Sequence, residues 1–189
     1  MDNKLKILNY LGKHIEEKFT MRELSKKTKI PYATFYRTLN KMSDLIMKDR
    51  KGNTVLVELK AKDSLSSYLA VSSEEEKKEY LKKTPLIKKI NSEINTKDIV
   101  ILFGSYAKEK YTKKSDVDFL IINKEGKKTI DFSKYELLFR KEINPIFITK
   151  KEFRQMLRSD EENIAKQALK NNIILNNPQN FWELVIGAV

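Results

Sequence analysis

Two short polar motifs in the second half of the chain combine residue types and spacing that could do chemistry. Gly104-Ser105 directly follows the apolar run Ile99–Phe103, and ten residues separate Ser105 from the motif Asp116-Val117-Asp118. Glycine lets the backbone approach an anion without a Cβ in the way, and the first turn of a helix offers unpaired N–H groups and a partial positive charge. The sequence therefore predicts a phosphate-holding turn at Gly104 and Ser105, at the start of a short helix from Tyr106 to about Lys110.

The two aspartates begin a second apolar run, which predicts a strand over residues 117–122. Alternate residues of a strand point to the same face, so we expect the carboxylates of Asp116 and Asp118 side by side. Two neighbouring anions repel each other and are costly to desolvate, and a divalent cation offsets both effects. Mg²⁺ prefers one or two carboxylates together with substrate phosphates. The alternative for such a pair on its own is a strand start with two solvated aspartates.

The strand, Gly-Ser turn, short helix and Ser-Asp-x-Asp strand of FGSYAKEKYTKKSDVDFLII together resemble the signature of the nucleotidyltransferase superfamily with the DNA polymerase beta-like fold, including its minimal, antitoxin-type branch. The resemblance implies that Gly104 and Ser105 hold the β- and γ-phosphates of a nucleoside triphosphate, with ATP favoured. It also implies that Asp116 and Asp118 are the catalytic residues and bind Mg²⁺, or Mn²⁺ in its place. A hydroxyl would then attack the α-phosphorus, with pyrophosphate leaving.

Two departures from the family pattern bear on this activity. The family usually has a glycine a few residues after Gly-Ser, where this chain has Glu109. Active members also supply a third carboxylate from a following strand; the matching slot falls at Asn144 or Pro145, with Glu142 and Asp131 as substitutes. Two functions therefore stay open. One is a magnesium-dependent nucleotidyltransferase coupled to a DNA-binding domain, and the other is a DNA-binding transcriptional regulator whose transferase-like domain binds nucleotide with little or no transfer.

The first third of the chain has the element order of a DNA-binding module. Apolar spacing predicts helices over residues 4–14, 21–27 and 32–42, with a capping box at Thr20 and Glu23. Strand-like residues 45–48 and 54–59 flank Asp49-Arg-Lys-Gly-Asn53, whose Gly-Asn pair predicts a hairpin turn. This order resembles a winged helix-turn-helix, which implies that residues 1–60 bind double-stranded DNA.

In that resemblance, the third helix exposes a polar face to the DNA major groove. The candidate contact residues on this helix and on the hairpin are Tyr32, Thr34, Arg37, Lys41, Arg50 and Lys51. Residues 1–60 hold 14 Lys and Arg against 7 Asp and Glu, so they carry +7 of the chain's net charge of +12. Such a bias favours a polyanionic partner. A packing or dimerisation module with a lysine-rich, solvated surface is the alternative.

The remaining segments predict a helical connector and an α+β domain. The connector, residues 61–84, would contain two short helices, one from Ser64 to Ala70 and one beginning at Ser73. The transferase-like domain would occupy residues 85–189, with a helix from Pro85, strands over 99–103, 117–122 and 143–148, helices around 132–139, 152–171 and 178–186, and an apolar stretch at 173–175. Pro145 predicts an edge position for the third of these strands. The expected fold class is thus α+β, a winged helix-turn-helix followed by a small mixed-sheet domain.

Composition sets the remaining expectations. The chain has no cysteine, hence no disulfide framework and no thiolate metal site, which fits a cytoplasmic location. No apolar run reaches the roughly 20 residues that span a membrane, so we expect the C-terminal FWELVIGAV in the core or at a dimer contact. Besides nucleotide and DNA, the resemblance to antitoxins implies a protein partner, such as a toxin whose hydroxyl accepts the nucleotide. A homodimer is left open.

Overall fold

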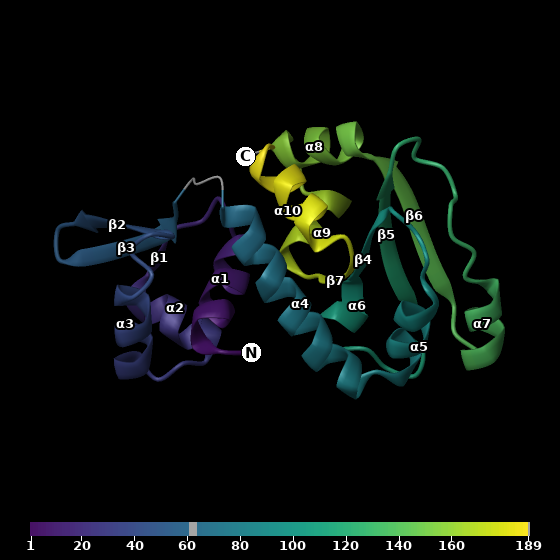
Figure 1. The fold of residues 1–189 in the computed structure, drawn as a ribbon, viewed down its shortest axis with the longest axis horizontal. Coiled ribbons are helices and arrows are strands. Elements are labelled where there is room, and N and C mark those ends of the chain that lie inside the picture. Colours follow the sequence, from purple (N-terminus) through teal and green to yellow (C-terminus); the bar gives the residue numbers. More distant parts are fainter. Residues whose placement is uncertain (61–63, 189) are drawn as a thin grey trace. The chain divides into compact units, whose positions relative to one another are not determined.

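The computed structural model describes residues 1–60 and 64–188 of the 189-residue chain. Its contacts divide the chain into two compact units, Met1–Ser72 and Ser73–Val189, and Figure 1 labels the elements of each. Helix α4 (Leu65–Lys83) runs across the boundary between them. The candidate residues for DNA contact lie in the first unit, and those for nucleotide and metal lie in the second.

The first unit, before α4, combines three helices with a small antiparallel sheet. Its elements are α1 (Asn3–Lys13), β1 (Phe19–Thr20), α2 (Met21–Thr28), α3 (Tyr32–Asn40), β2 (Ile46–Lys51) and β3 (Thr54–Leu59), and its strand order is β1-β3-β2. The predicted capping box is confirmed, because Thr20 Oγ1 accepts from the Glu23 N–H at 3.2 Å and the Glu23 carboxylate accepts from the Thr20 N–H at 2.9 Å. The assignment of this unit as a winged helix-turn-helix stays a prediction.

The β2–β3 hairpin is longer than the sequence indicates. The expectation that its first strand ends at Lys48 is wrong, because pairing with β3 continues through Lys51, which lies opposite Thr54. A two-residue turn, Gly52-Asn53, closes the hairpin, and Gly52 has a φ of 60°, which glycine adopts without strain. Arg50 and Lys51 therefore lie on the strand beside the turn and not in a loop.

The second unit is built on a four-stranded mixed sheet. Its elements after α4 are α5 (Pro85–Glu93), β4 (Ile99–Phe103), α6 (Gly104–Ala107), β5 (Val117–Asn123), α7 (Ser133–Phe139), β6 (Ile143–Thr149), α8 (Lys150–Arg158), α9 (Ile164–Lys170), β7 (Ile173–Asn176) and α10 (Pro178–Ile186). The strand order is β6-β5-β4-β7, with β5 parallel to β6, and β4 antiparallel to β5 and β7. The predicted mixed sheet is confirmed, and so is the edge position of the strand that contains Pro145.

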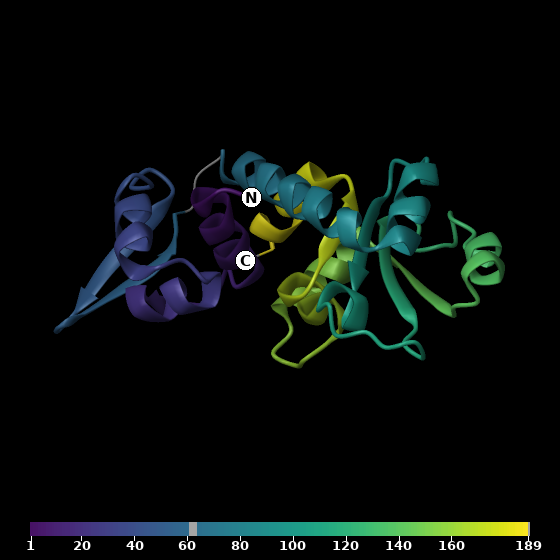
Figure 2. The ribbon, with the colours of Figure 1, turned by 90° about the horizontal axis from the view of Figure 1, so that it is seen from below.

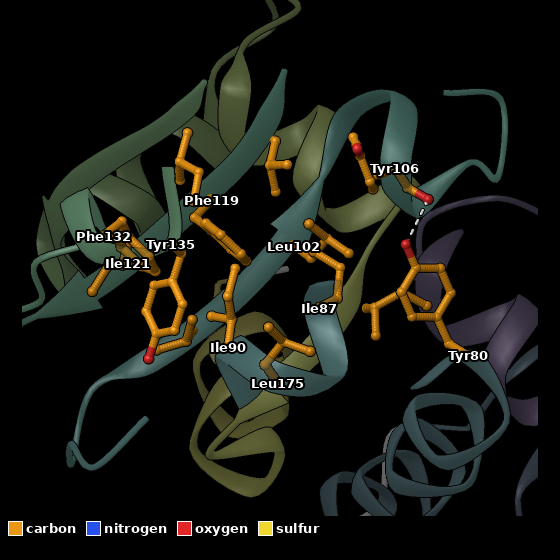
Figure 3. Packing of buried hydrophobic residues seen from close by; sticks show 14 residues of the cluster. Tyr80, Ile87, Ile90, Leu102, Tyr106, Phe119, Ile121, Phe132, Tyr135 and Leu175 are labelled. Atoms are coloured by element: carbon orange, nitrogen blue, oxygen red, sulfur yellow. Dashed lines mark hydrogen bonds between the residues drawn. The ribbon is translucent and has the colours of Figure 1, made fainter. Parts of the chain in front are cut away.

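Helices cover both faces of this sheet, which explains the unbroken apolar runs of its two central strands. On one face, a buried cluster joins residues of β4 and β5 to side chains of α4, α5 and α7, as Figure 3 shows for Leu102, Phe119, Ile121, Tyr80, Ile87, Ile90 and Tyr135. On the other face, α8 contacts β5 and β6, while α9 and α10 contact β4 (Figures 1 and 2). Strands β4 and β5 therefore form a rigid base for the residues at their ends.

Two helical predictions in this unit and at its boundary are wrong. The residues expected to form two short helices form the single helix α4, because no glycine or proline interrupts them, and Ser72 Oγ donates to the Leu69 carbonyl at 2.7 Å instead of capping a new helix. Conversely, the helix expected over 152–171 is split into α8 and α9. Asn163 causes the break, since its side chain donates to the Met156 carbonyl at 2.7 Å and accepts from the Ala165 N–H at 3.1 Å, which caps α9.

The apolar C-terminal segment packs inside the second unit. Phe181 and Trp182 of α10 are fully buried. The ring centroid of Phe181 lies 5.8 Å from that of Phe153 in α8, and Trp182 Nε1 donates to Ser73 Oγ at 2.9 Å. Core packing was one of the two predicted outcomes for this segment. Across residues 1–60 and 64–188, no helix combines the length and apolarity needed to cross a membrane.

Candidate functional site

Gly104 lies where the central strand β4 ends and the four-residue helix α6 begins. Its φ is +69°, a conformation that residues with side chains rarely adopt. A Cβ added to Gly104 would lie 2.1 Å from Asp118 Oδ2 and 3.1 Å from Asp118 Cγ. Only glycine therefore lets the start of α6 lie against this carboxylate. The next residue, Ser105, is half-buried, and its hydroxyl has no hydrogen-bond partner in the part of the chain that the structure describes.

The two aspartates approach this turn from the neighbouring strand. Asp118 of β5 is paired with Phe103 of β4, which places its carboxylate beside Gly104, and Asp116 lies two residues earlier. Partial burial raises the pKa of Asp118, a hydrogen bond from Asn144 opposes that shift, and the negative charge of Asp116 raises the pKa further. The structure thus brings the glycine turn and both aspartates together, and it leaves a half-buried pair of acids whose mutual repulsion a cation would relieve.

Asn144 occupies the place beside Asp118 where the sequence lacks a third carboxylate. It is the direct partner of Asp118 in the parallel pairing of β5 with β6, and its side chain donates a hydrogen bond to the Asp118 carboxylate. Neither suggested substitute completes the set, because within the described residues no three acidic, histidine or cysteine side chains converge as a metal site would require. Asp131 instead pairs with Lys128 at 2.9 Å, and Glu142 is exposed just before β6.

Glu109 supplies the backbone geometry that a glycine would provide after α6. Its φ is +54°, and the N–H groups of Glu109 and Lys110 donate to the carbonyls of Tyr106 and Ser105, each at 3.0 Å. These bonds close the helix as a glycine C-terminal cap does. The departure from the family pattern therefore leaves the turn intact, although a left-handed conformation costs a residue other than glycine about 1–2 kcal/mol.

Lys141, which no sequence motif marks, holds the loop that leads into Asp116. Its Nζ donates to the carbonyl oxygens of Thr112 at 3.4 Å, of Lys113, and of Ser115 at 3.2 Å. The loop also bonds internally, since the Thr112 N–H donates to Ser115 Oγ at 2.9 Å and the Ser115 N–H donates to the Thr112 carbonyl at 3.2 Å. A cation bound to main-chain carbonyls leaves no trace in residue types or periodicity, so only the fold reveals it.

Comparison with known families agrees with this arrangement. Residues 84–175 match the family model described as nucleotidyltransferase domain, and the matched span contains the glycine turn, both aspartates, Asn144 and Lys141. Residues 84–175 are therefore similar to nucleotidyltransferase domains. The match supports a nucleotidyl transfer activity in general, with a nucleoside triphosphate as substrate. No curated protein and no solved structure matches the chain.

Three tyrosines hold helix α6 in place. The rings of Tyr106 and Tyr111 stack with their centroids 4.1 Å apart and their planes 3° from parallel. Tyr80 Oη of α4 donates to the Tyr106 carbonyl at 3.0 Å (Figure 3). Burial raises the pKa of Tyr80, so its hydroxyl keeps the proton that it donates. The Gly-Ser turn is therefore tied both to α4 and to the loop that follows α6.

The candidate DNA-contact residues lie on exposed parts of the first unit. Phe35 and Leu39 bury one side of α3, which leaves Thr34 half-buried and the other five candidates exposed: Tyr32, Arg37, Lys41, Arg50 and Lys51. Lys41 is the C-terminal cap residue of α3 and not part of the helix itself. Among the described residues, the guanidinium groups have only local partners, since Arg37 Nε donates to the Ala33 carbonyl at 3.4 Å and Arg50 Nε donates to the Gly52 carbonyl at 3.3 Å.

Proposed function

We propose that this protein is a magnesium-dependent nucleotidyltransferase in which a DNA-binding unit precedes the transferase domain. The observation that carries the proposal is the close approach of Gly104 to Asp118, where an added Cβ would lie 2.1 Å from Oδ2. A phosphate held at the start of α6 would lie next to the two carboxylates. Such a gathering of anions calls for a divalent cation, and the oxygen ligands present are those that Mg²⁺ prefers.

The side chains fit one Mg²⁺ better than two, because Asp118 is accompanied by one further carboxylate, that of Asp116, and by the neutral Asn144. Asp116 and Asp118 would bind Mg²⁺, or Mn²⁺ in its place, which when bound neutralises charge on the triphosphate. Gly104 N–H and Ser105 Oγ would orient the β- and γ-phosphates. The acceptor hydroxyl oxygen bonds to the α-phosphorus, the bond from that phosphorus to the bridging oxygen breaks, pyrophosphate leaves, and the hydroxyl proton passes to water.

For the first unit, we propose double-stranded DNA as the partner. Support comes from the +7 charge of residues 1–60 and from the exposed face of α3 with Tyr32 and Arg37. Lysine and arginine side chains that neutralise phosphates release counterions and so favour binding to a polyanion. For the acceptor of the nucleotide, we propose a protein hydroxyl, as the resemblance to antitoxins implies.

One observation favours a second candidate function. Asn144 brings no charge to the position beside Asp118, and the described residues offer no third carboxylate there. A second metal ion, which would activate the attacking hydroxyl, would be bound weakly. The protein would then be a DNA-binding regulator that binds nucleotide and transfers it slowly or not at all.

Transfer of label from ATP carrying radioactive phosphorus at the α position separates these functions. With Mg²⁺ and an extract of the native host, label should move onto a macromolecule, and EDTA or Asp116→Ala should stop it. Asp160→Ala removes an exposed carboxylate outside the site and should transfer as the wild type does. Magnesium-dependent ATP binding without transfer selects the regulator, and absence of such binding contradicts both functions.

A further inference from the structure

Asp116 and Asp118 are positioned by different means. Asp118 lies within β5, paired with Phe103 on one side and with Asn144 on the other, so the sheet fixes its backbone. Strand β5 begins at Val117, and Asp116 therefore precedes the first residue of the strand. Its backbone direction depends on the loop 112–115 that leads into it. The pair of carboxylates can bind one cation only if this loop holds Asp116 in place.

The ammonium group of Lys141 binds the carbonyl oxygens of that loop. Three carbonyl oxygens, those of Thr112, Lys113 and Ser115, accept from Lys141 Nζ, and the last of them belongs to the residue directly before Asp116. An ammonium group has three donors and no acceptor, so three carbonyls satisfy it fully. Carbonyl oxygens that point to one place repel one another, and the cation offsets this repulsion.

The main chain around Lys141 strengthens the same connection. The Val117 N–H donates to the carbonyl of Glu142 at 2.9 Å. Residues 141 and 142 thus hold the chain on both sides of Asp116, through the lysine side chain before it and through the Glu142 backbone after it. In the described part of the chain, Lys141 Nζ bonds to carbonyls and not to the Asp116 carboxylate, which stays available for a metal ion.

We propose that Lys141 is a positioning residue of the nucleotide site: by gathering the carbonyls of Thr112, Lys113 and Ser115, it sets the Asp116 carboxylate beside that of Asp118 for binding of a magnesium nucleotide. The inference rests on the proposed function, because it assigns Lys141 a role in that site. Lys141 acts through the loop and does not touch substrate. Loss of the Lys141 side chain should therefore weaken magnesium-dependent nucleotide binding more than it weakens nucleotide binding in the absence of metal.

The test compares three variants of the full chain in binding of a fluorescent ATP analogue at increasing Mg²⁺ concentration. Lys141→Met keeps the apolar stem and should raise the Mg²⁺ concentration at half-maximal binding about tenfold, the scale seen for groups that orient metal ligands. Lys141→Arg keeps the charge and several donors and should recover most of the wild-type response. Lys88→Met removes an exposed lysine of α5 and should change nothing. Equal Mg²⁺ midpoints for Lys141→Met and wild type would overturn the inference, even if Lys141→Met lowers the melting temperature.

A second measurement keeps the inference distinct from the proposed function. Amide hydrogen exchange reads the loop directly, because the N–H groups of Thr112, Lys114 and Ser115 are all bonded within it. In Lys141→Met these amides should exchange at least about tenfold faster while those of β4 keep their protection. Unchanged exchange would show that the ammonium does not hold the loop. If the wild type binds no magnesium nucleotide, the proposed function fails, and a role of Lys141 in it fails with it, whatever the exchange shows.

Discussion

The proposed nucleotide site and the proposed DNA-contact face differ in how the fold holds their side chains. At the nucleotide site, Asp118 is paired with residues on both neighbouring strands, and Gly104 lies so close that a Cβ would overlap its carboxylate. On the proposed DNA-contact face, Arg37 and Arg50 bond, within the part of the chain that the structure describes, only to carbonyls of their own helix or hairpin. A site that binds a small, highly charged ligand needs preorganised groups, whereas contacts to a phosphate backbone depend more on the number and exposure of charges. Substitutions in the first region should therefore change stability and binding together, and those in the second should change binding alone.

Gly104→Ala should have the largest effect. The new Cβ would require Asp118 to move, and the φ of +69° would be strained, at about 1–2 kcal/mol. Displacement of a site group by about 1 Å can cost roughly 100-fold in activity, so magnesium-dependent ATP binding and transfer should nearly vanish. Gly52→Ala is the matched control, because Gly52 has a φ of +60° and open space around its added Cβ. It should lower the free energy of unfolding and leave ATP binding unchanged; an ATP affinity lowered equally by both variants would contradict the steric argument.

Asn144→Asp tests whether residue 144 lies close enough to Asp118 to contribute to metal binding. A carboxylate at this position would stand directly beside Asp118 and add a third negative charge. Without metal, the added repulsion should lower the melting temperature. With Mg²⁺, the added charge should lower the metal concentration at half-maximal ATP binding by about tenfold, because metal affinity follows the number of charged oxygen ligands.

The control for this variant is Asn95→Asp, which makes the same change of charge at an exposed position before β4. Thermal melts without metal measure the first effect, and ATP binding at increasing Mg²⁺ concentration measures the second. Mg²⁺ should raise the melting temperature of Asn144→Asp more than that of Asn95→Asp. If the two increases are equal, residue 144 does not face the metal.

Arg37→Ala tests the other side of the comparison. If Arg37 contacts a DNA phosphate, its loss should weaken binding to mixed-sequence duplex DNA by about 1 kcal/mol, roughly fivefold, and should reduce the slope of log K against log salt by about one. Because the side chain bonds to no described residue other than Ala33, the free energy of unfolding should change by less than about 0.5 kcal/mol. Lys6→Ala, on an exposed position of α1, is the control. Binding that does not depend on salt, or an unfolding free energy lowered by several kcal/mol, would remove the contrast between the two regions.

The sequence predicts the parts of this molecule that depend on local patterns. Apolar runs locate β4 and β5, Pro145 marks the edge strand, and Thr20 with Glu23 marks the start of α2. Local patterns also fail where a side chain has two uses. The pattern predicts a helix start at Ser73, although α4 continues through this residue and the Ser73 hydroxyl accepts from Trp182 Nε1. The cap formed by Asn163 is likewise hidden inside a continuous helical pattern.

Contacts between distant segments could not be predicted. The spacing of Asp116 and Asp118 indicates a shared face, but the placement of Asn144 beside Asp118 follows from the parallel pairing of β5 with β6. Likewise, Lys141 bonds to carbonyls 26 to 29 residues earlier, which no motif encodes. Residue types specify which groups are available, and the strand register decides which of them meet.

Glu109→Gly should have the smallest effect. It tests whether the backbone that closes α6, beside the proposed nucleotide site, is also optimal for stability. Relief of the left-handed conformation should raise the free energy of unfolding by about 1–2 kcal/mol. The added freedom of glycine in the unfolded chain should lower it by about 0.5–1 kcal/mol. The pair with Lys83, 3.2 Å long and largely exposed, contributes less than about 1 kcal/mol. The variant should therefore be at most slightly more stable than the wild type in urea unfolding. Glu109→Gln isolates the ion pair, since it keeps the strained backbone and loses the charge. If Glu109→Gly proves less stable than Glu109→Gln, which lacks the same ion pair, the strain of the left-handed backbone at this position is smaller than the cost of the freedom that glycine adds to the unfolded chain.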